Sequence, residues 1–411
     1  MISDKISRIL LVSANRMTNP YPVFPLGLAF LEAGLKEAGY SVRIWDQLIH
    51  PLEELWQGLD WADAAGISLR NVDNVSSTAP EGYLDEYVQL LGMIRERSQL
   101  PLLAGGSAFS IFPAEMLDSL GLKWGIQGEA EKAIVQWLAA LNGDSSMEEV
   151  PGLLYRNGDG SIRQNPQVVI PAEEIPSPRP DHALVAAYLK RGGMMNVQSQ
   201  RGCAFRCTYC TYPWIEGKCY RHRNPEDIVE EIRHLQAAGT RYVFFTDSVF
   251  NTSPRHVQAV CEAIIRGKLG IEWGCFARPQ NLDGDLLDLM IEAGLRHIEF
   301  GSDSFCDTTL QTYGKSFRFK DILQASETAA SRKVHACHYI IFGGPGETEA
   351  TIRETVANSK LLPDSPIFAF SGMRIYPHTP LFGQSGTEKS PAELLDPAYY
   401  SPDELPAAER E

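Results

Sequence analysis

The sequence of 411 residues has little cysteine for its length. All eight cysteines lie at or after Cys203, and this sparse use excludes the disulfide scaffold of a small secreted domain. No apolar run approaches the roughly 20 residues that cross a membrane. The first such run, Ile9–Val12, is also too short for the core of a secretory signal. We therefore expect a protein of the reducing cytoplasm without a membrane span.

Basic residues are scarce relative to acidic ones. The 37 lysines and arginines face 52 aspartates and glutamates, which leaves a net charge of -15. Such a surface repels phosphate backbones, so we expect no nucleic-acid partner. The hydrophobic share of 44% is that of a globular protein. At about 150 residues per domain, the chain has room for two or three domains.

Residues 1–141 alternate short aliphatic runs with amphipathic stretches, a pattern typical of parallel βα units. No Gly-x-Gly-x-x-Gly follows the first run, where Ser13-Ala14-Asn15-Arg16 stands, so a dinucleotide site is not indicated. We predict a doubly wound, Rossmann-like α/β domain. Its predicted strands are 8–12, 41–45, 64–68, 102–104 and 123–126, and its first helix is 26–38.

The composition shifts over residues 142–193. Asn-Gly-Asp-Gly at 157–160 separates two strand-like runs, and five prolines crowd 166–180, which indicates a hairpin and a linker. Strands and helices alternate again over 194–385, which predicts a partial (β/α)6 barrel of the TIM type. Residues 386–411 form a short acidic tail. The predicted barrel strands are 196–200, 241–246, 271–276, 297–300, 335–342 and 368–374.

Cys203, Cys207 and Cys210 stand within eight residues, directly after the first predicted barrel strand. A [4Fe-4S] cluster takes one thiolate per iron, so three cysteines would leave the fourth iron open to a ligand that is not protein. One alternative is a structural zinc site completed by Cys219 or His222, but no second CxxC pair accompanies the loop. The other alternative, a disulfide, is disfavoured in a reducing compartment. We expect a cluster with one open iron.

The spacing of these cysteines, together with Tyr209, resembles the CxxxCxΦC loop of the radical S-adenosylmethionine (SAM) enzymes. The resemblance implies that SAM binds the open iron through its amino and carboxylate groups. It also implies that one electron from the cluster cleaves SAM to a 5'-deoxyadenosyl radical. Later strand ends resemble the family in order and spacing, although Asp303 stands where the family usually has Glu. The resemblance implies SAM-binding roles for Tyr209, Thr246, Asp247, Ser302, Asp303, Ile341, Gly343 and Arg374.

Residues 1–141 resemble the cobalamin-binding domain that precedes the barrel in one subclass of that family. The matching landmarks are glycine-containing strand ends, where a flat cofactor or its nucleotide tail can approach the backbone. The DxHxxG motif is missing and His50 is the domain's only histidine, so we expect no histidine ligand to cobalt. The alternative is a Rossmann-like domain that binds another nucleotide or none. The implied cobalamin-binding residues are Ser68, Arg70, Gly105, Gly106, Ser107, Gly128 and Glu129.

Together these resemblances imply a cobalamin-dependent radical SAM enzyme, foremost a methyltransferase that acts on an unactivated carbon. The same parts would also serve cyclisation, coupling or rearrangement without methylation. A third alternative is a non-catalytic metal or corrinoid carrier. The five other cysteines lack ligand spacing, which disfavours the relatives that carry a second cluster and modify tRNA. We expect a small-molecule, lipid or peptide substrate and an electron donor such as flavodoxin or ferredoxin.

Overall fold

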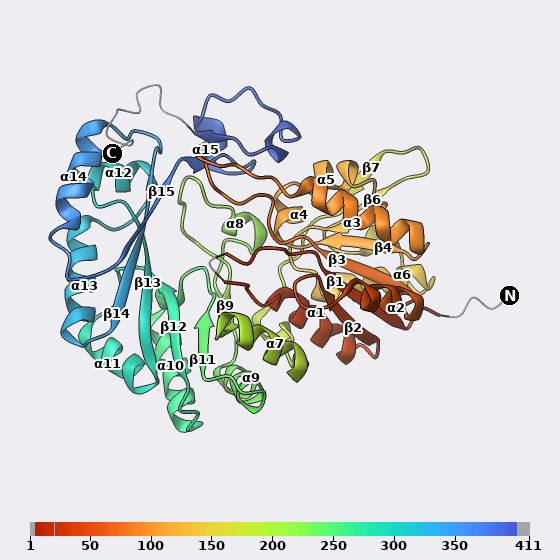
Figure 1. Cartoon of the computed structure of the whole chain (residues 1–411), viewed down its shortest axis with the longest axis horizontal. Coiled ribbons are helices and arrows are strands. Elements are labelled where there is room, and N and C mark those ends of the chain that lie inside the picture. Colours follow the sequence, from red (N-terminus) through yellow and green to blue (C-terminus); the bar gives the residue numbers. More distant parts are fainter. Residues whose placement is uncertain (1–4, 20, 401–411) are drawn as a thin grey trace.

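The computed structural model describes residues 5–19 and 21–400 of the chain, which fold into two α/β halves built on separate sheets (Figure 1). The first sheet has seven strands in the order β2-β1-β3-β4-β5-β6-β7. The second has six strands in the order β15-β14-β13-β12-β11-β8. The fold class is therefore the one that the sequence predicts.

Buried aliphatic runs build the parallel part of the first sheet. β1 lies between β2 and β3 and alternates between two cores, with Ile9 and Leu11 packed against α1 and α6, and Leu10 and Val12 against α2 to α5. Helices on both faces make this a doubly wound sheet. All five predicted strands and the predicted first helix are confirmed. The bounds are β1 (Arg8–Ser13), β2 (Ser41–Asp46), β3 (Ala64–Ser68), β4 (Leu102–Gly105), β5 (Trp124–Ile126), α1 (Leu26–Glu37), α2 (Leu52–Trp61), α3 (Leu84–Arg97), α4 (Ser107–Ile111), α5 (Pro113–Ser119) and α6 (Glu131–Leu141).

The predicted hairpin consists of β6 (Leu153–Arg156) and β7 (Ile162–Gln164), which pair antiparallel on either side of the Asn-Gly-Asp-Gly turn. β6 also pairs antiparallel with β5, so the hairpin extends the first sheet. A proline-rich stretch then leads to α7 (His182–Gly192), which begins where the Asp181 side chain accepts hydrogen bonds from the backbone of Ala183 and Leu184. The segment between the two predicted domains thus supplies one edge of the first sheet.

The second sheet is parallel and carries its helices on one face. Two of these helices have Asn224 and Ser253 as N-caps, each followed by a proline at the first helical position. The six predicted strands form. The bounds are β8 (Met195–Val197), β11 (Tyr242–Phe245), β12 (Glu272–Ala277), β13 (Leu295–Asp303), β14 (His335–Phe342), β15 (Ile367–Ser371), α9 (Pro225–Ala237), α10 (Pro254–Arg266), α11 (Gly284–Glu292), α13 (Phe319–Ser331) and α14 (Glu349–Ser359).

Two predicted barrel strands are interrupted. The first ends at Val197 because the Asp247 carboxylate accepts the backbone N–H groups of Ser199 and Gln200, which a longer strand would pair. The last breaks at Gly372, whose φ of 79° lies in the left-handed region. Short antiparallel pairs follow both breaks: β9 (Gln200–Arg201) with β10 (Arg221–His222), and β16 (Met373–Arg374) with β17 (Tyr399–Tyr400).

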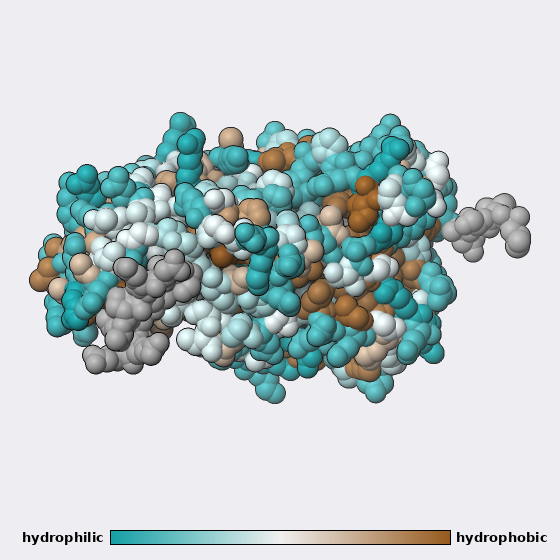
Figure 2. Space-filling view, turned by 90° about the horizontal axis from the view of Figure 1, so that it is seen from above, coloured by the Kyte–Doolittle hydropathy of each residue, from teal (hydrophilic) through white to brown (hydrophobic). Residues whose placement is uncertain are grey.

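Hydrophilic residues cover most of the face seen in Figure 2, and hydrophobic ones appear there in small separate groups. Within residues 5–19 and 21–400, no helix has the length and apolar character needed to cross a membrane.

Candidate functional site

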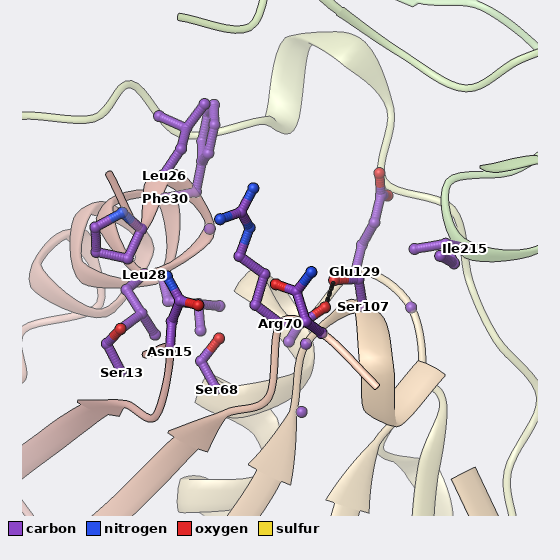
Figure 3. A pocket seen from close by; sticks show the side chains of 18 of the residues that line it. Ser13, Asn15, Leu26, Leu28, Phe30, Ser68, Arg70, Ser107, Glu129 and Ile215 are labelled. Atoms are coloured by element: carbon purple, nitrogen blue, oxygen red, sulfur yellow. Dashed lines mark hydrogen bonds between the residues drawn. The ribbon is translucent and has the colours of Figure 1, made fainter. Parts of the chain in front are cut away.

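A cavity of about 630 Å³ lies between the two halves of the molecule and is lined by residues of both. Its N-terminal wall consists of loops at the carboxyl ends of β1, β3 and β4, where Ser13, Asn15 and Ser68 lie (Figure 3). Its other wall includes Thr246, at the end of β11, and Tyr212, at the start of α8 (Tyr212–Ile215). Ligands of open α/β sheets and of barrels bind at the carboxyl ends of the strands. The cavity therefore lies where both folds place a ligand.

The seven cobalamin-binding residues predicted from the sequence all line this cavity. Gly106 shows why its loop needs glycine: its φ is 99°, and a Cβ there would lie 2.5 Å from the carbonyl oxygen of Leu69. The Ser107 hydroxyl donates to the carbonyl of Arg70 at 2.6 Å, which fixes the loop after β3 against the loop after β4. These residues are Ser68, Arg70, Gly105, Gly106, Ser107, Gly128 and Glu129.

Arg70 brings a positive charge into the cavity. Its side chain extends toward Leu26 and Phe30 of α1 (Figure 3), and no carboxylate within the described ranges forms an ion pair with it. Surrounding protein lowers the pKa of its guanidinium. Beside it, the buried side-chain oxygen of Asn71 has no hydrogen-bond partner in the structure. The cavity thus offers a cation and an acceptor that a polar ligand can engage.

Glu129 is already engaged with the other half of the molecule. It forms ion pairs with Arg201 at 3.3 Å and with Arg221 at 2.7 Å, and it accepts the backbone N–H of Ile170 at 2.8 Å. Glu131 pairs with Arg201 at 2.6 Å. No motif in the sequence marks these arginine partners, although Arg201 lies only two residues before Cys203. We call Glu129, Glu131, Arg201 and Arg221 the interdomain ion-pair cluster.

The three predicted cluster ligands lie in one loop that follows β9. Gly202 introduces it with a φ of 87°, and a Cβ at that position would lie 2.1 Å from the carbonyl oxygen of Cys219. Cys203 is buried, whereas Cys207 and Cys210 are half-buried. Burial, together with negative charge on Cys207 and Cys203, raises the pKa of the Cys210 thiol to about 12. The three thiols therefore lie near one another, in surroundings where a bound cation would stabilise their thiolates.

This arrangement fits an iron-sulfur cluster better than the zinc alternative. Among the residues the structure describes, no group of three or more His, Cys, Asp or Glu side chains is placed to hold one metal ion. Cys219 is exposed and the His222 ring stacks on His256 with 4.2 Å between centroids, and within the described residues neither is grouped with the three cysteines around one metal position. A [4Fe-4S] cluster instead distributes its thiolates over different irons.

Tyr209 and Asp303 meet at the Cys loop in a buried trio with Lys315. The Tyr209 hydroxyl donates to the Asp303 carboxylate, and the Lys315 ammonium lies 2.5 Å from the same oxygen. Lys315 also donates to the carbonyl of Gly301 at 3.3 Å. Asp303 is thereby neutralised by a lysine that the sequence analysis missed, because no motif surrounds Lys315.

The other predicted SAM-binding residues divide by location. Thr246 lines the cavity, and Ile341 is half-buried near the end of β14. Asp247 is fully buried and accepts the backbone N–H of Ser199 at 2.7 Å. The remaining three make contacts within the protein, and the SAM-binding roles of all eight predicted residues stay predictions. Ser302 bonds His338 at 2.8 Å, the N–H of Gly343 donates to Glu347, and Arg374 pairs with Asp73 at 2.8 Å.

A family model described as "Radical SAM superfamily" matches residues 197–358. Tryptophan 2-C-methyltransferase of Streptomyces laurentii is 25% identical over 91% of this chain and 73% of its own. Cytidylyl-2-hydroxyethylphosphonate methyltransferase of Streptomyces wedmorensis is 23% identical over 89% of this chain and 77% of its own. Anaerobic magnesium-protoporphyrin IX monomethyl ester cyclase of Cereibacter sphaeroides is 25% identical over 92% of this chain and 62% of its own.

Two solved structures of a radical SAM methyltransferase are also similar to this chain. The radical SAM methyltransferase TsrM of Kitasatospora setae, with tryptophan and a SAM analogue bound, matches at a TM-score of 0.80 and 25% identity over 91% of this chain and 74% of that one. TsrM with cobalamin and a [4Fe-4S] cluster bound shares the fold at a TM-score of 0.84 and 23% identity, over 99% of this chain and 86% of that one. Residues 197–358 therefore belong to the radical SAM superfamily, and the chain as a whole is similar to radical SAM methyltransferases, one of which is solved with cobalamin and a [4Fe-4S] cluster bound.

Proposed function

We propose that this protein is a cobalamin-dependent radical SAM methyltransferase that acts on an unactivated carbon of a small-molecule substrate. One observation carries the proposal: a single cavity is lined both by the predicted cobalamin-binding residues and by Thr211 and Tyr212, which directly follow Cys210. A methyl carrier held by the first sheet and a radical source held by the Cys loop would therefore share one cavity.

When bound, the cluster and SAM supply a 5'-deoxyadenosyl radical, and cobalamin supplies the methyl group. The protein's own residues bind and orient. Cys203, Cys207 and Cys210 would hold the cluster, while the trio of Tyr209, Asp303 and Lys315 fixes the loop between the last two cysteines. The glycines at the end of β4 let a ligand approach the backbone.

We also propose where the reaction takes place and what reduces the cluster. An electron donor such as flavodoxin or ferredoxin would reduce the cluster in the cytoplasm, and the acidic surface argues against a nucleic-acid substrate.

We propose the domain division 1–141, 142–193, 194–385 and 386–411, with β6 and β7 as an addition to the first sheet. Residues 401–411 of the proposed tail lie outside the described residues.

The test is anaerobic reconstitution with iron, sulfide, cobalamin and methyl-deuterated SAM. Mass spectrometry would follow deoxyadenosine and labelled products in a cell extract. Deuterium transfer to a small molecule supports the proposal. Each of Cys203→Ala, Cys207→Ala and Cys210→Ala should abolish SAM cleavage, whereas the exposed control Cys219→Ala should not. SAM cleavage that survives in the first three variants would contradict the assigned ligands.

The similarity to a ring-forming cyclase supports a second candidate, cyclisation or rearrangement without methylation. Deoxyadenosine without label transfer would favour this second candidate. Cofactor binding without any SAM consumption would favour a non-catalytic carrier.

A further inference from the structure

The barrel sheet presents a second chemical environment on the face opposite its helices. Side chains alternate across a strand, and Val243 and Phe245 of β11 pack among the helices. Tyr242 and Phe244 therefore face the other way. Residues that pair across neighbouring strands have side chains on the same face of the sheet. Gly274 of β12 pairs with Phe244 and with His297, and Phe276 of β12 pairs with Glu299. Tyr339 of β14 pairs with Phe368 of β15, so the same face continues across the sheet. We call Tyr242, Phe244, Phe276, His297, Glu299, Tyr339, Phe368 and Phe370 the inner face.

A hydrogen-bonded chain crosses three strands of the inner face. The Tyr242 hydroxyl lies 2.6 Å from Nδ1 of His297, and Nε2 of His297 lies 2.9 Å from Glu299. The Tyr339 hydroxyl donates to the other Glu299 oxygen at 2.8 Å. Gly274 makes room for this chain, since a Cβ there would lie 2.3 Å from the Tyr242 oxygen and 2.5 Å from Nδ1 of His297.

Glu299 has no permanent counter-charge. Its side chain is 11% exposed, and no lysine or arginine in the described part of the chain forms an ion pair with it. When the Tyr242 hydroxyl donates to Nδ1, His297 is neutral and donates from Nε2 to the carboxylate. The hydrogen-bonded group of Tyr242, His297, Glu299 and Tyr339 then carries one negative charge in mostly buried surroundings. Burying this charge costs free energy unless a cation approaches it.

Aromatic rings surround this carboxylate and are unusually accessible for large apolar groups. Phe276, Phe368 and Phe370 are 37%, 48% and 49% exposed. The Tyr339 ring stacks on Phe368 with 5.3 Å between centroids, and Phe244 packs edge-on against Phe276 at 4.9 Å. Exposed ring faces favour planar apolar molecules, and their negative π-surfaces favour cations.

The inner face continues into the cavity of the proposed site. Thr246 follows Phe244 by two residues, and Asn196 of β8 pairs with Phe244; both line the cavity. From the N-terminal half, Tyr21 approaches the same region. Burial raises the pKa of its hydroxyl, Glu299 raises it further and Arg70 lowers it, which places Tyr21 near the charges of both halves.

We propose that the inner face is the substrate-binding wall, and that the substrate is a planar aromatic molecule carrying a basic nitrogen that Glu299 binds. Phe276, Phe368 and Phe370 contact the ring. The role of this molecule as the methyl acceptor rests on the proposed function, but its binding does not.

The test compares two probes that share a ring and differ in charge, 1-naphthylmethylamine and 1-naphthylacetate. Their dissociation constants are measured by equilibrium dialysis against the anaerobically reconstituted holoenzyme. We expect the cation to bind at least about tenfold more tightly than the anion. Glu299→Gln should abolish that preference, whereas Phe368→Leu should weaken both probes to a similar degree.

Two controls separate a binding role from a structural one. Tyr339→Phe removes a hydrogen bond and keeps the charge, so the preference for the cation should survive. Glu272→Gln removes an exposed carboxylate of β12 that pairs with Arg296 at 2.9 Å, and it should leave both constants unchanged. Thermal unfolding of every variant reports whether it folds.

Equal binding of the two probes, saturable binding of neither, or a preference that survives Glu299→Gln would overturn the proposal. Deoxyadenosine formation from SAM is measured in the same preparations. Intact SAM cleavage without the charge preference contradicts the substrate class alone, whereas loss of SAM cleavage with the preference intact contradicts the proposed function.

Discussion

The two walls of the cavity are built in different ways. On the N-terminal side the predicted residues line the cavity directly, through glycine backbones and through Arg70, which forms no ion pair within residues 5–19 and 21–400. On the barrel side, Thr246 is the one predicted SAM-binding residue that lines it, and Asp247, Asp303 and Arg374 are bonded within the protein. The first wall therefore leaves its predicted residues open to a ligand, while on the second wall most of them are engaged in hydrogen bonds and ion pairs.

The largest effect should come from the Cys loop. Cys207→Ala leaves two of the three thiolates for a cluster, and we expect the visible absorption of the reconstituted cluster to disappear. Cobalamin retention should remain, because the cobalamin-binding residues lie on the other wall. Ultraviolet-visible spectroscopy measures both, and simultaneous loss of cobalamin would show that the two walls do not act separately.

The interdomain ion-pair cluster should give the next largest effect. Arg201→Met leaves Glu129 and Glu131 buried with less positive charge, which should destabilise the protein by about 3–5 kcal/mol. Lys315→Met leaves Asp303 without its cation, so we expect a comparable loss of unfolding free energy. The double variant Lys315→Met/Asp303→Asn should recover part of that loss. Urea unfolding gives these values; a cost below about 1 kcal/mol for Arg201→Met would show that the pairs do not join the halves.

A smaller effect is expected at the glycine wall. Gly106→Ala places a Cβ against Leu69 at a left-handed φ, which should cost about 1–3 kcal/mol. Gly92 is the matched control, because it lies in α3 with open space around the position of a Cβ, and alanine there should stabilise by up to about 1 kcal/mol. Cobalamin affinity should fall only in the Gly106 variant, as measured by dialysis.

Per pH unit, the smallest effect on stability is expected at Asp247, where we predict a pH dependence. Burial raises the pKa of this carboxyl to about 7, well above its ordinary value, so its protonated form is favoured in the folded state. Its contribution to stability is complete below about pH 4 and is lost as the pH rises to 7. Relative to Asp247→Asn, the wild type should therefore lose about 1.4 kcal/mol per pH unit in that window. Parallel pH profiles of unfolding free energy would contradict this assignment.

The sequence was sufficient for the features that the backbone encodes. Glycine at positions 106 and 202 marks turns that no side chain tolerates, and the periodicity of apolar residues predicts both sheets. The sequence was insufficient to predict the ion pairs of Lys315 and Arg201 and the hydrogen bonds of Glu299, because the partners lie on elements distant in sequence. Such pairs depend on tertiary packing, which spacing within one segment does not reveal.

We propose above all that the Cys loop holds a four-iron cluster with one iron free to bind SAM. Electron paramagnetic resonance of the reduced, cobalamin-loaded protein tests it most directly. We predict a [4Fe-4S] signal that shifts when SAM is added and is absent in Cys203→Ala. A signal that SAM leaves unchanged, or a preparation in which the metal is zinc, would contradict the claim.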